Sequence, residues 1–326
     1  MTFIRYIFWL LIPAFASSQN LFPVYIDGGY GYIDREGTIK LGGSFSYVGL
    51  FENGFAVVAP KSQGALSMAS RGIIDESGKW VVEPIYTQAR NFSEGMAAVM
   101  RNGKWGFVNE SGIEVIIPQY KKVGDFKNGL AWVDNKGYVG FINNNGDFVV
   151  NPIYYDAKDF SGEFALVRNK TDWGIVNSSG KEVITPQYYD VMQISDGHFC
   201  ASLTSKNRYA YFNLDGKMIT RPEFEDCKVF SDERAAVKIA GLWGYIDKTG
   251  STVIPNIYAK ADDFSEGLAG VKQQAKWGFI NTDGKVQIDA IYDSVEPFRN
   301  GLAFVKLNGV YCYIDKNGKI VYREGK

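Results

Sequence analysis

Apolar and polar residues alternate with a period of two in short stretches along the whole chain, and each stretch ends at a turn signal. An Ala-x-Val pair recurs in these stretches, as in Ala97/Val99, Ala131/Val133, Ala165/Val167, Ala269/Val271 and Ala303/Val305. This alternation predicts a strand with one face turned inward. Asn102-Gly103 and Asn308-Gly309 follow two of the strands and favour a tight hairpin turn. No helical periodicity of useful length is present, so the pattern predicts an all-β chain.

The second strand of each predicted hairpin carries a motif that repeats. It reads aromatic-Gly-apolar-apolar-Asn/Asp-x-x-Gly, and most copies are 34 residues apart. The glycines that close the copies are Gly37, Gly78, Gly112, Gly146, Gly180, Gly216, Gly250, Gly284 and Gly318. Repetition at such a period indicates an array of small units that stack on one another. We therefore predict one array of about nine repeats over residues 19–326, with no room for a separate catalytic domain.

The clearest copies of the motif contain the dipeptide Trp-Gly, at Trp105-Gly106, Trp173-Gly174, Trp243-Gly244 and Trp277-Gly278. We expect these residues to form the structural core of the repeat, with each glycine leaving room for a neighbouring backbone or ring. The Asn or Asp of the motif should cap the next turn, because its side chain bonds to the backbone two residues on. A third strand should then end at a proline such as Pro118, which cannot donate to the ladder. The segment after it has room for a short fourth strand.

Two architectures suit a chain of three-stranded meanders. A 34-residue unit buries too little apolar surface to stand alone, so neighbouring units must stack. A β-propeller usually closes by sharing strands between its first and last blades. Here Val24–Ile26 in the first unit and Ile320–Tyr322 in the last both read as complete strands. We therefore expect an open, twisted β superhelix or solenoid, with a β-propeller as the alternative.

The first residues have the pattern of a signal peptide. Arg5 precedes an apolar run from Tyr6 to Phe15, and small residues follow from Ala16 to Ser18. The run is too short for a membrane-spanning helix, which needs about 20 residues. We expect residues 1–18 to be removed, leaving a chain without a transmembrane segment that is exported to the periplasm, the cell surface or the medium.

The amino-acid composition limits the partners and the catalytic groups that we expect. The 35 basic and 36 acidic residues nearly cancel, which argues against nucleic acid as a partner. His198 is the single histidine, and we expect it to be a packing or surface residue rather than a catalytic one. Cys200, Cys227 and Cys312 show no paired spacing, so we expect buried free thiols, with a Cys200–Cys227 disulfide as the alternative.

Together with the four Trp-Gly copies, the stretch Phe264–Val271 (Phe-Ser-Glu-Gly-Leu-Ala-x-Val) resembles the WG-repeat, or KWG, family of bacterial proteins. The resemblance covers nine units from about residue 21 onward. It implies an exported or surface repeat protein of β structure, usually without an assigned activity. The family supplies no catalytic residues to transfer.

The function that we expect is binding or scaffolding through an extended repeat surface, without catalysis, cofactor or metal. The ligand would be a protein, a peptide or a glycan, and the partner an unknown protein or a cell-envelope glycan. Trp80, Trp132 and Phe148 are the candidate binding residues, because they are aromatics outside the conserved columns of the repeat. The alternative is a glycan hydrolase that uses carboxylates at variable positions, namely Asp262, Asp263, Glu223 and Glu225.

Overall fold

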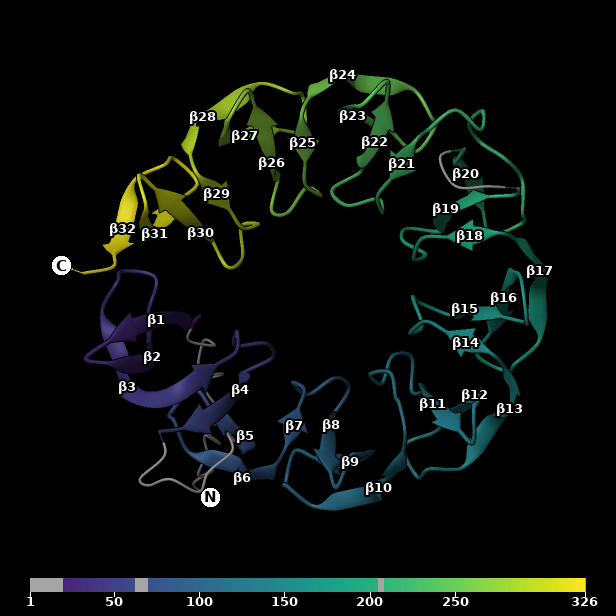
Figure 1. Cartoon of the computed structure of the whole chain (residues 1–326), viewed down its shortest axis with the longest axis horizontal. Coiled ribbons are helices and arrows are strands. Elements are labelled where there is room, and N and C mark those ends of the chain that lie inside the picture. Colours follow the sequence, from purple (N-terminus) through teal and green to yellow (C-terminus); the bar gives the residue numbers. More distant parts are fainter. Residues whose placement is uncertain (1–19, 62–69, 205–207, 326) are drawn as a thin grey trace, which may run out of the picture.

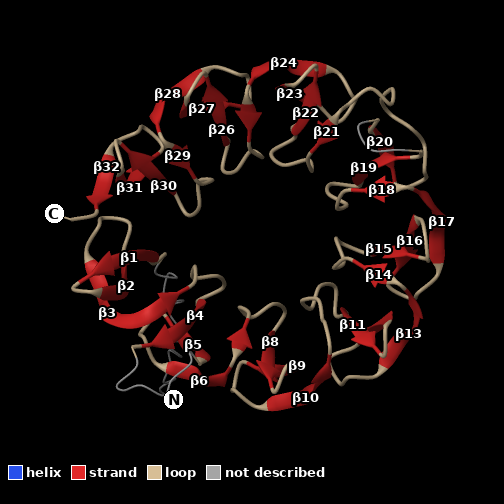
Figure 2. Ribbon diagram, viewed as in Figure 1, coloured by secondary structure: helices blue, strands red, loops and turns tan. Residues whose placement is uncertain are grey.

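The computed structural model describes residues 20–61, 70–204 and 208–325. Its 32 strands form eight antiparallel sheets that stand side by side in a ring around a central opening (Figures 1 and 2). The described residues contain no helix, and so none that could cross a membrane. The all-β prediction is confirmed. The ring is a β-propeller, so the expected open superhelix is wrong and its alternative is right.

Eight of the nine repeat units are meanders of three strands, unit 6 having two in its described part, and the units are numbered here along the chain. The first strands are β1 (Phe22–Ile26), β4 (Phe55–Pro60), β8 (Met96–Arg101), β11 (Ala131–Asn135), β15 (Phe164–Arg168), β19 (His198–Ser202), β22 (Ala235–Ile239), β26 (Leu268–Gln273) and β30 (Leu302–Leu307). The second strands, which carry the Trp-Gly motif or its variants, are β2 (Gly29–Ile33), β5 (Arg71–Asp75), β9 (Lys104–Asn109), β12 (Tyr138–Ile142), β16 (Trp173–Asn177), β20 (Ala210–Asn213), β23 (Leu242–Ile246), β27 (Lys276–Asn281) and β31 (Val310–Asp315).

The third strands form the outer wall of the ring (Figure 1). They are β3 (Ile39–Val48), β6 (Trp80–Tyr86), β10 (Glu114–Tyr120), β13 (Phe148–Tyr154), β17 (Glu182–Tyr188), β24 (Thr252–Tyr258), β28 (Val286–Tyr292) and β32 (Ile320–Arg323). Six short strands lie in the connecting segments between units: β7 (Gln88–Ala89), β14 (Asp156–Ala157), β18 (Asp190–Val191), β21 (Asp226–Cys227), β25 (Lys260–Ala261) and β29 (Ser294–Val295). The short fourth strand that the sequence left room for is therefore present in most units.

Units 1 and 2 share one sheet, which is why nine units form eight sheets. The long strand β3 bends from the outer wall of unit 1 into unit 2 and pairs there with β4, as in Phe45↔Pro60 and Val48↔Val58. In the other units the third strand does not pair with the first strand of the next unit, so each of these sheets contains a single unit.

The glycine of the Trp-Gly motif lies where the third strand crosses the second. A Cβ atom on Gly278 would lie 2.6 Å from the carbonyl oxygen of Ile288, closer than packed atoms come. The pairing of β27 with β28 shifts register at this crossing, between Trp277↔Tyr292 and Phe279↔Ile288. The backbone of the third strand, rather than a ring, thus fills the space beside the glycine.

The prediction that proline ends the third strand is wrong. Pro118 lies inside β10, within the irregular stretch between the pairs Ile116↔Phe107 and Tyr120↔Trp105. A bulged strand at the edge of a sheet tolerates a residue without an N–H, so the strand continues to its aromatic residue.

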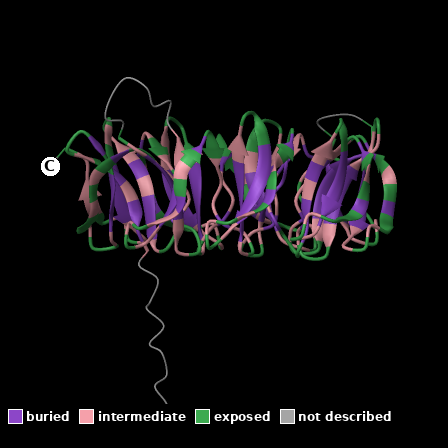
Figure 3. Ribbon diagram, turned by 90° about the horizontal axis from the view of Figure 1, so that it is seen from below, coloured by how far each residue is buried: buried purple, intermediate pink, exposed green. Residues whose placement is uncertain are grey.

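The core lies between neighbouring sheets. Buried residues occupy the middle of the strands, while exposed residues gather at the loops on the two faces of the ring (Figure 3). In one interface Phe107 of unit 3 packs edge-on against Phe126 of the next connecting segment, with ring centroids 4.8 Å apart. Polar contacts reinforce such interfaces: the hydroxyl of Ser265 donates to the carbonyl of Phe298, 33 residues on, at 2.7 Å. Each unit is stabilised by the next, as the repeat predicted.

The ring closes without a shared sheet. Phe22, Val24 and Ile33 of unit 1 pack against Leu302 and Tyr313 of unit 9 in one cluster. β32 pairs with β31 and not with β1, so the two end sheets meet face to face. Complete strands at both ends of an array therefore do not exclude a closed ring, which is why the sequence argument failed.

A disulfide joins Cys200 of unit 6 to Cys227 of the next connecting segment. The expectation of free thiols is wrong for these two cysteines and right for Cys312, which is free and buried. In the described part of unit 6 the third strand is reduced to two isolated bridges, Phe212↔Met218 and Tyr209↔Phe224. The disulfide thus lies at the junction where the repeat is most irregular. The predicted signal peptide falls within residues 1–19, outside the described residues.

Candidate functional site

The Asn/Asp column of the repeat is structural. In unit 3 the side-chain oxygen of Asn109 accepts hydrogen bonds from the backbone N–H groups of Ser111 and Ile113, both at 3.0 Å. The same pair of bonds is made by the other members of the column, which are Asp34, Asp75, Asn143, Asn177, Asn213, Asp247, Asn281 and Asp315. The turn-capping prediction is confirmed at every copy.

The three predicted binding aromatics do not form one site. Trp80 is half-buried in the cluster between units 1 and 2, where its ring meets Phe45 edge-on. Trp132 is also half-buried, in the cluster of units 4 and 5, and it hydrogen-bonds to Asp159. Phe148 is exposed at the start of β13 on the outer wall. None of the three lines a cavity described below.

The tryptophans of the Trp-Gly copies lie at the interfaces between units. Trp105 and Trp173 are buried, and Trp243 and Trp277 are half-buried. Cations cover several of these rings; the guanidinium of Arg90, for example, lies 4.8 Å from the centre of a Trp105 ring. Such contacts stabilise the interface by about 0.5–1 kcal/mol at exposed sites.

The carboxylates of the hydrolase alternative are distributed over two places. Asp262 pairs with Lys228 at 3.4 Å beside a small cavity that Asp263 also lines. Glu225 accepts the backbone N–H of Gly241, and Glu223 is an exposed residue of unit 6.

Asp263 is the unusual member of this set. Burial raises the pKa of its carboxyl, against the attraction of Lys228, and the nearby charge of Asp262 adds to the rise. One of its oxygens, Oδ1, is buried and has no hydrogen-bond partner among the described residues.

His198 has a local structural role. Its Nδ1 atom lies 2.6 Å from the carbonyl oxygen of Asp196, and its ring packs 5.2 Å from that of Phe230. Over the described ranges no group of three His, Cys, Asp or Glu residues could hold a metal ion.

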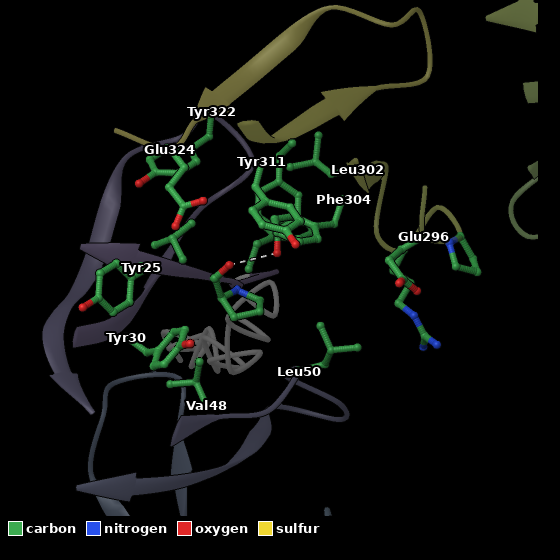
Figure 4. Close-up of a pocket in the computed structure, with 16 residues that line it drawn as sticks. Tyr25, Tyr30, Val48, Leu50, Glu296, Leu302, Phe304, Tyr311, Tyr322 and Glu324 are labelled. Atoms are coloured by element: carbon green, nitrogen blue, oxygen red, sulfur yellow. Dashed lines mark hydrogen bonds between the residues drawn. The ribbon is translucent and has the colours of Figure 1, made fainter. Parts of the chain in front are cut away.

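A cavity lined largely by aromatic residues lies where unit 9 meets unit 1, a junction that we call the closing seam. It encloses about 590 Å³, within the range of small-ligand sites. Unit 1 contributes Tyr25, Tyr30 and Leu50, and unit 9 contributes Phe304 and Tyr311, as Figure 4 shows.

Aromatic pairs line both walls of this seam cavity. Tyr25 and Tyr30 meet edge-on at 5.2 Å, and Phe304 and Tyr311 stack at 5.1 Å. Tyr25 remains 47% exposed and Tyr311 39% exposed, so both rings are partly accessible. The ammonium of Lys306 also lies 4.9 Å from the centre of the Tyr311 ring.

Charged groups border the same cavity. Arg299 lines the cavity from the segment before β30. Glu296, from the same segment, and Glu324, which follows β32, are labelled in Figure 4. Apolar walls with a few polar groups at the rim are typical of binding sites.

Sequence reasoning missed this site, although the signal was present. Tyr30 and Tyr311 replace the tryptophan of the motif in the first and last units. Taken separately they look like weakened copies. In a closed ring the two units are neighbours, so the substitutions meet in one place.

The model of the WG containing repeat matches eight stretches of the chain: residues 30–59, 72–105, 105–138, 140–170, 173–206, 209–243, 243–277 and 277–311. No curated protein sequence matches the chain.

Among solved structures, one described as a eukaryotic initiation factor aligns with a TM-score of 0.65 and 12% identity, over 94% of this chain and 96% of that chain. Hsv2p of Kluyveromyces lactis aligns at 0.44 and 10% identity over 73% of this chain and 94% of its own. PorZ, a surface component of the type-IX secretion system of Porphyromonas gingivalis, aligns at 0.36 and 12% identity over 94% of this chain and 50% of its own. The first match shows a shared fold over nearly the whole of both chains and overturns the expected open superhelix. The family model covers most of the sequence, and the chain belongs to the WG-repeat family.

Proposed function

We propose that this protein is an exported, non-enzymatic binding or scaffolding protein, and that its binding site is the seam cavity. The observation that carries the proposal is the gathering of exposed aromatic rings from the two ends of the chain around one cavity of about 590 Å³. Exposed Tyr side chains combine apolar faces with hydroxyl groups, which suits recognition of a partner or ligand.

The geometry favours binding over the glycan hydrolase. Asp262 is engaged with Lys228, and Glu225 with Gly241 and Lys238, so these carboxylates support the fold. The walls of the seam cavity are mainly aromatic and apolar, with the carboxylates of Glu296 and Glu324 among the lining residues.

A pull-down with matched variants tests the proposal. The baits are the wild-type chain, Tyr30→Glu in the seam, and Tyr138→Glu on unit 4. Tyr138 is the matched control: it is 43% exposed against 40% for Tyr30, and it meets Tyr155 edge-on at 5.3 Å, as Tyr30 meets Tyr25 at 5.2 Å. Circular dichroism checks that all three baits are folded.

We expect a partner from a cell-envelope extract, prepared with and without peptidoglycan, to be enriched by the wild type and by Tyr138→Glu. Tyr30→Glu should retain less than about a tenth of it, because a charge in an apolar pocket is costly to desolvate. Equal enrichment by all three baits, or none by the wild type, would overturn the seam as the binding site.

The export part of the proposal rests on the pattern of residues 1–18 and is supported by a disulfide, which persists in oxidising compartments. Mass spectrometry of the chain made in a bacterium with its own N-terminus tests it. We expect a processed chain that begins between residues 17 and 19 and is recovered outside the cytoplasm. An intact N-terminus in the cytoplasmic fraction would contradict export.

A further inference from the structure

The connecting segments show what fills the other seams. In unit 5 the N–H of Lys158 donates to the carbonyl of Leu166 at 2.9 Å, and the N–H of Tyr155 donates to that of Arg168 at 2.8 Å. These bonds add the short strand β14 to the edge of the first strand β15 that faces away from β16. Ala157, between the donors, is 4% exposed.

The residue at the position of Ala157 is small or β-branched in every connecting segment between units 2 and 9. It packs in the same cluster as the second-strand residue of the preceding unit, for example Val123 with Trp105, Val191 with Trp173, and Val295 with Trp277. Each complete seam, meaning a junction with a connecting segment, thus buries one small or β-branched side chain beside the second strand of the preceding unit. The neighbour is a Trp ring for Val123, Val191 and Val295, and Val139 for Ala157.

The closing seam lacks this added strand in the described part of the chain. Val24 of β1 corresponds to Val167 of β15, because Val24 pairs with Gly31 as Val167 pairs with Gly174. Pro23 and Tyr25 therefore correspond to Leu166 and Arg168. β1 pairs with β2 alone among the described strands. Its other edge, and the ring of Tyr311, face the seam cavity.

A tyrosine hydroxyl marks the vacant place. In three complete seams a tyrosine hydroxyl of the second strand donates to a carbonyl of the next connecting segment. The pairs are Tyr32 to Gly49, Tyr211 to Lys228, and Tyr245 to Asp262. In the closing seam Tyr313 stands at the same position and donates instead to Pro23 on the edge of β1, at 2.9 Å. Pro23 itself has no N–H, which is tolerated on an edge strand.

We propose that the closing seam binds an extended peptide of a partner protein, which adds to the edge of β1 as the missing strand. This inference rests on the proposed function of the seam cavity and names its ligand class. Strand addition supplies affinity through main-chain hydrogen bonds and specificity through side-chain pockets. The peptide N–H at the Lys158 position bonds to Pro23, and the carbonyl of the same residue accepts from Tyr313.

The seam also specifies two side chains of the peptide. The position of Ala157 requires a small or β-branched apolar residue, since it lies against Val24 and Tyr311. The next position requires a basic residue. In the seam of units 7 and 8, Lys228 and Asp262 of successive connecting segments pair across the junction. Glu296 is the corresponding residue of unit 9, and it lines the cavity with Glu324. The ligand is therefore an extended segment in which Ala or Val precedes Lys or Arg.

Calorimetric titration of the full chain with a synthetic peptide tests this inference. The probe is Tyr-Asp-Ala-Lys-Asp-Phe, the sequence of residues 155–160, with both ends blocked. One control peptide carries a methyl group on the backbone nitrogen of the lysine at the fourth position, which removes the N–H that would donate to Pro23 and keeps the lysine side chain. A second control has Glu in place of that Lys. We expect each control to bind at least about tenfold more weakly than the probe.

Equal binding of the probe and the N-methyl peptide, or no binding of the probe, would overturn strand addition. A repeat with a chain that starts at Asn20 identifies the occupant, since all contacts described here are made by residues 20–325. Binding by that shorter chain alone would show that residues 1–19 fill the seam, which would overturn the partner peptide. If the probe fails while Tyr30→Glu still loses its envelope partner, the peptide class is wrong but the seam remains a binding site.

Discussion

The hydroxyl of Tyr313 donates a hydrogen bond to the carbonyl of Pro23 at 2.9 Å, across 290 residues of sequence. It joins the last unit to the first at the one junction of the ring that no described segment of backbone crosses. The contact cluster of Phe22, Val24 and Leu302 surrounds it. The closed state of the ring therefore depends locally on side chains from the two ends of the chain.

Tyr313→Phe should loosen this junction. Loss of the hydroxyl leaves the Pro23 carbonyl without its donor and should cost about 1 kcal/mol of unfolding free energy. Hydrogen exchange should quicken in β1 and β31 before the rest of the ring. Tyr245→Phe, which removes the bond to Asp262 at 2.7 Å in a connected seam, is the control. A similar exchange pattern in both variants would contradict a special role for the closing junction.

Gly278→Ala should destabilise the protein by about 1–3 kcal/mol, the range for overpacked sites. Its Cβ would lie 2.6 Å from the carbonyl of Ile288, and strand backbone cannot move away cheaply. Gly42→Ala in β3 is the matched control, because a Cβ there meets no atom within 4 Å. Chemical denaturation should place the control within about 0.5 kcal/mol of the wild type. Comparable losses in the two variants would rule out the strand-crossing explanation.

Reduction of the Cys200–Cys227 disulfide should lower the melting temperature. The two cysteines are 27 residues apart in sequence, and loop-closure entropy predicts a loss of about 3.5 kcal/mol. Scanning calorimetry with and without a reductant measures it. Cys312→Ala should show the same sensitivity to the reductant, since Cys312 is not part of the bond. Cys200→Ala combined with Cys227→Ala should be insensitive to it; a remaining effect of the reductant would contradict the assignment.

Asp263→Asn should stabilise the protein at neutral pH. Burial raises the pKa of the Asp263 carboxyl in the folded state, so its ionised form is disfavoured there relative to the unfolded chain. The stability that this group contributes is complete below its unfolded pKa and is lost as the pH rises through the folded pKa. The gain from Asp263→Asn should therefore be largest near pH 7 and vanish near pH 4.

Melting curves from pH 4 to 8 test this dependence, with about 2 °C expected for each kcal/mol in a chain of this size. The exposed turn residue Asp283 provides the control substitution Asp283→Asn. A gain that does not change with pH would show that the charge of Asp263 is not its cause.

Local features of this fold could be predicted from the sequence because each unit repeats them. The strand pattern of Ala97 and Val99, the Asn102-Gly103 turn and the capping role of Asn109 all depend on neighbours within a few residues. Asn102 and Gly103 indeed have φ angles of 52° and 72°, as the predicted turn requires.

The closing of the ring could not be predicted in the same way. It depends on the small rotation between successive sheets, added over the whole array, and no single residue encodes this sum. The contact of Tyr313 with Pro23 has no counterpart in the local pattern. For the same reason the site was missed: Tyr30 and Tyr311 become neighbours after the last unit has reached the first, whereas Trp80, Trp132 and Phe148 stand out within their own units.

Among residues 20–61, 70–204 and 208–325, one junction has no connecting segment, so the vacant edge follows from how these residues are connected. A circular permutant would join the end of β32 to β1 through a linker shaped like the other connecting segments, and would begin at a different unit. Such a molecule should keep the ring, and its linker should pair with the free edge of β1. The unit at the new start of the chain should then have a first strand with an unpaired edge. The edge that accepts the peptide would then lie at the new chain ends, whereas Tyr25 and Tyr311 would remain at the junction of units 9 and 1.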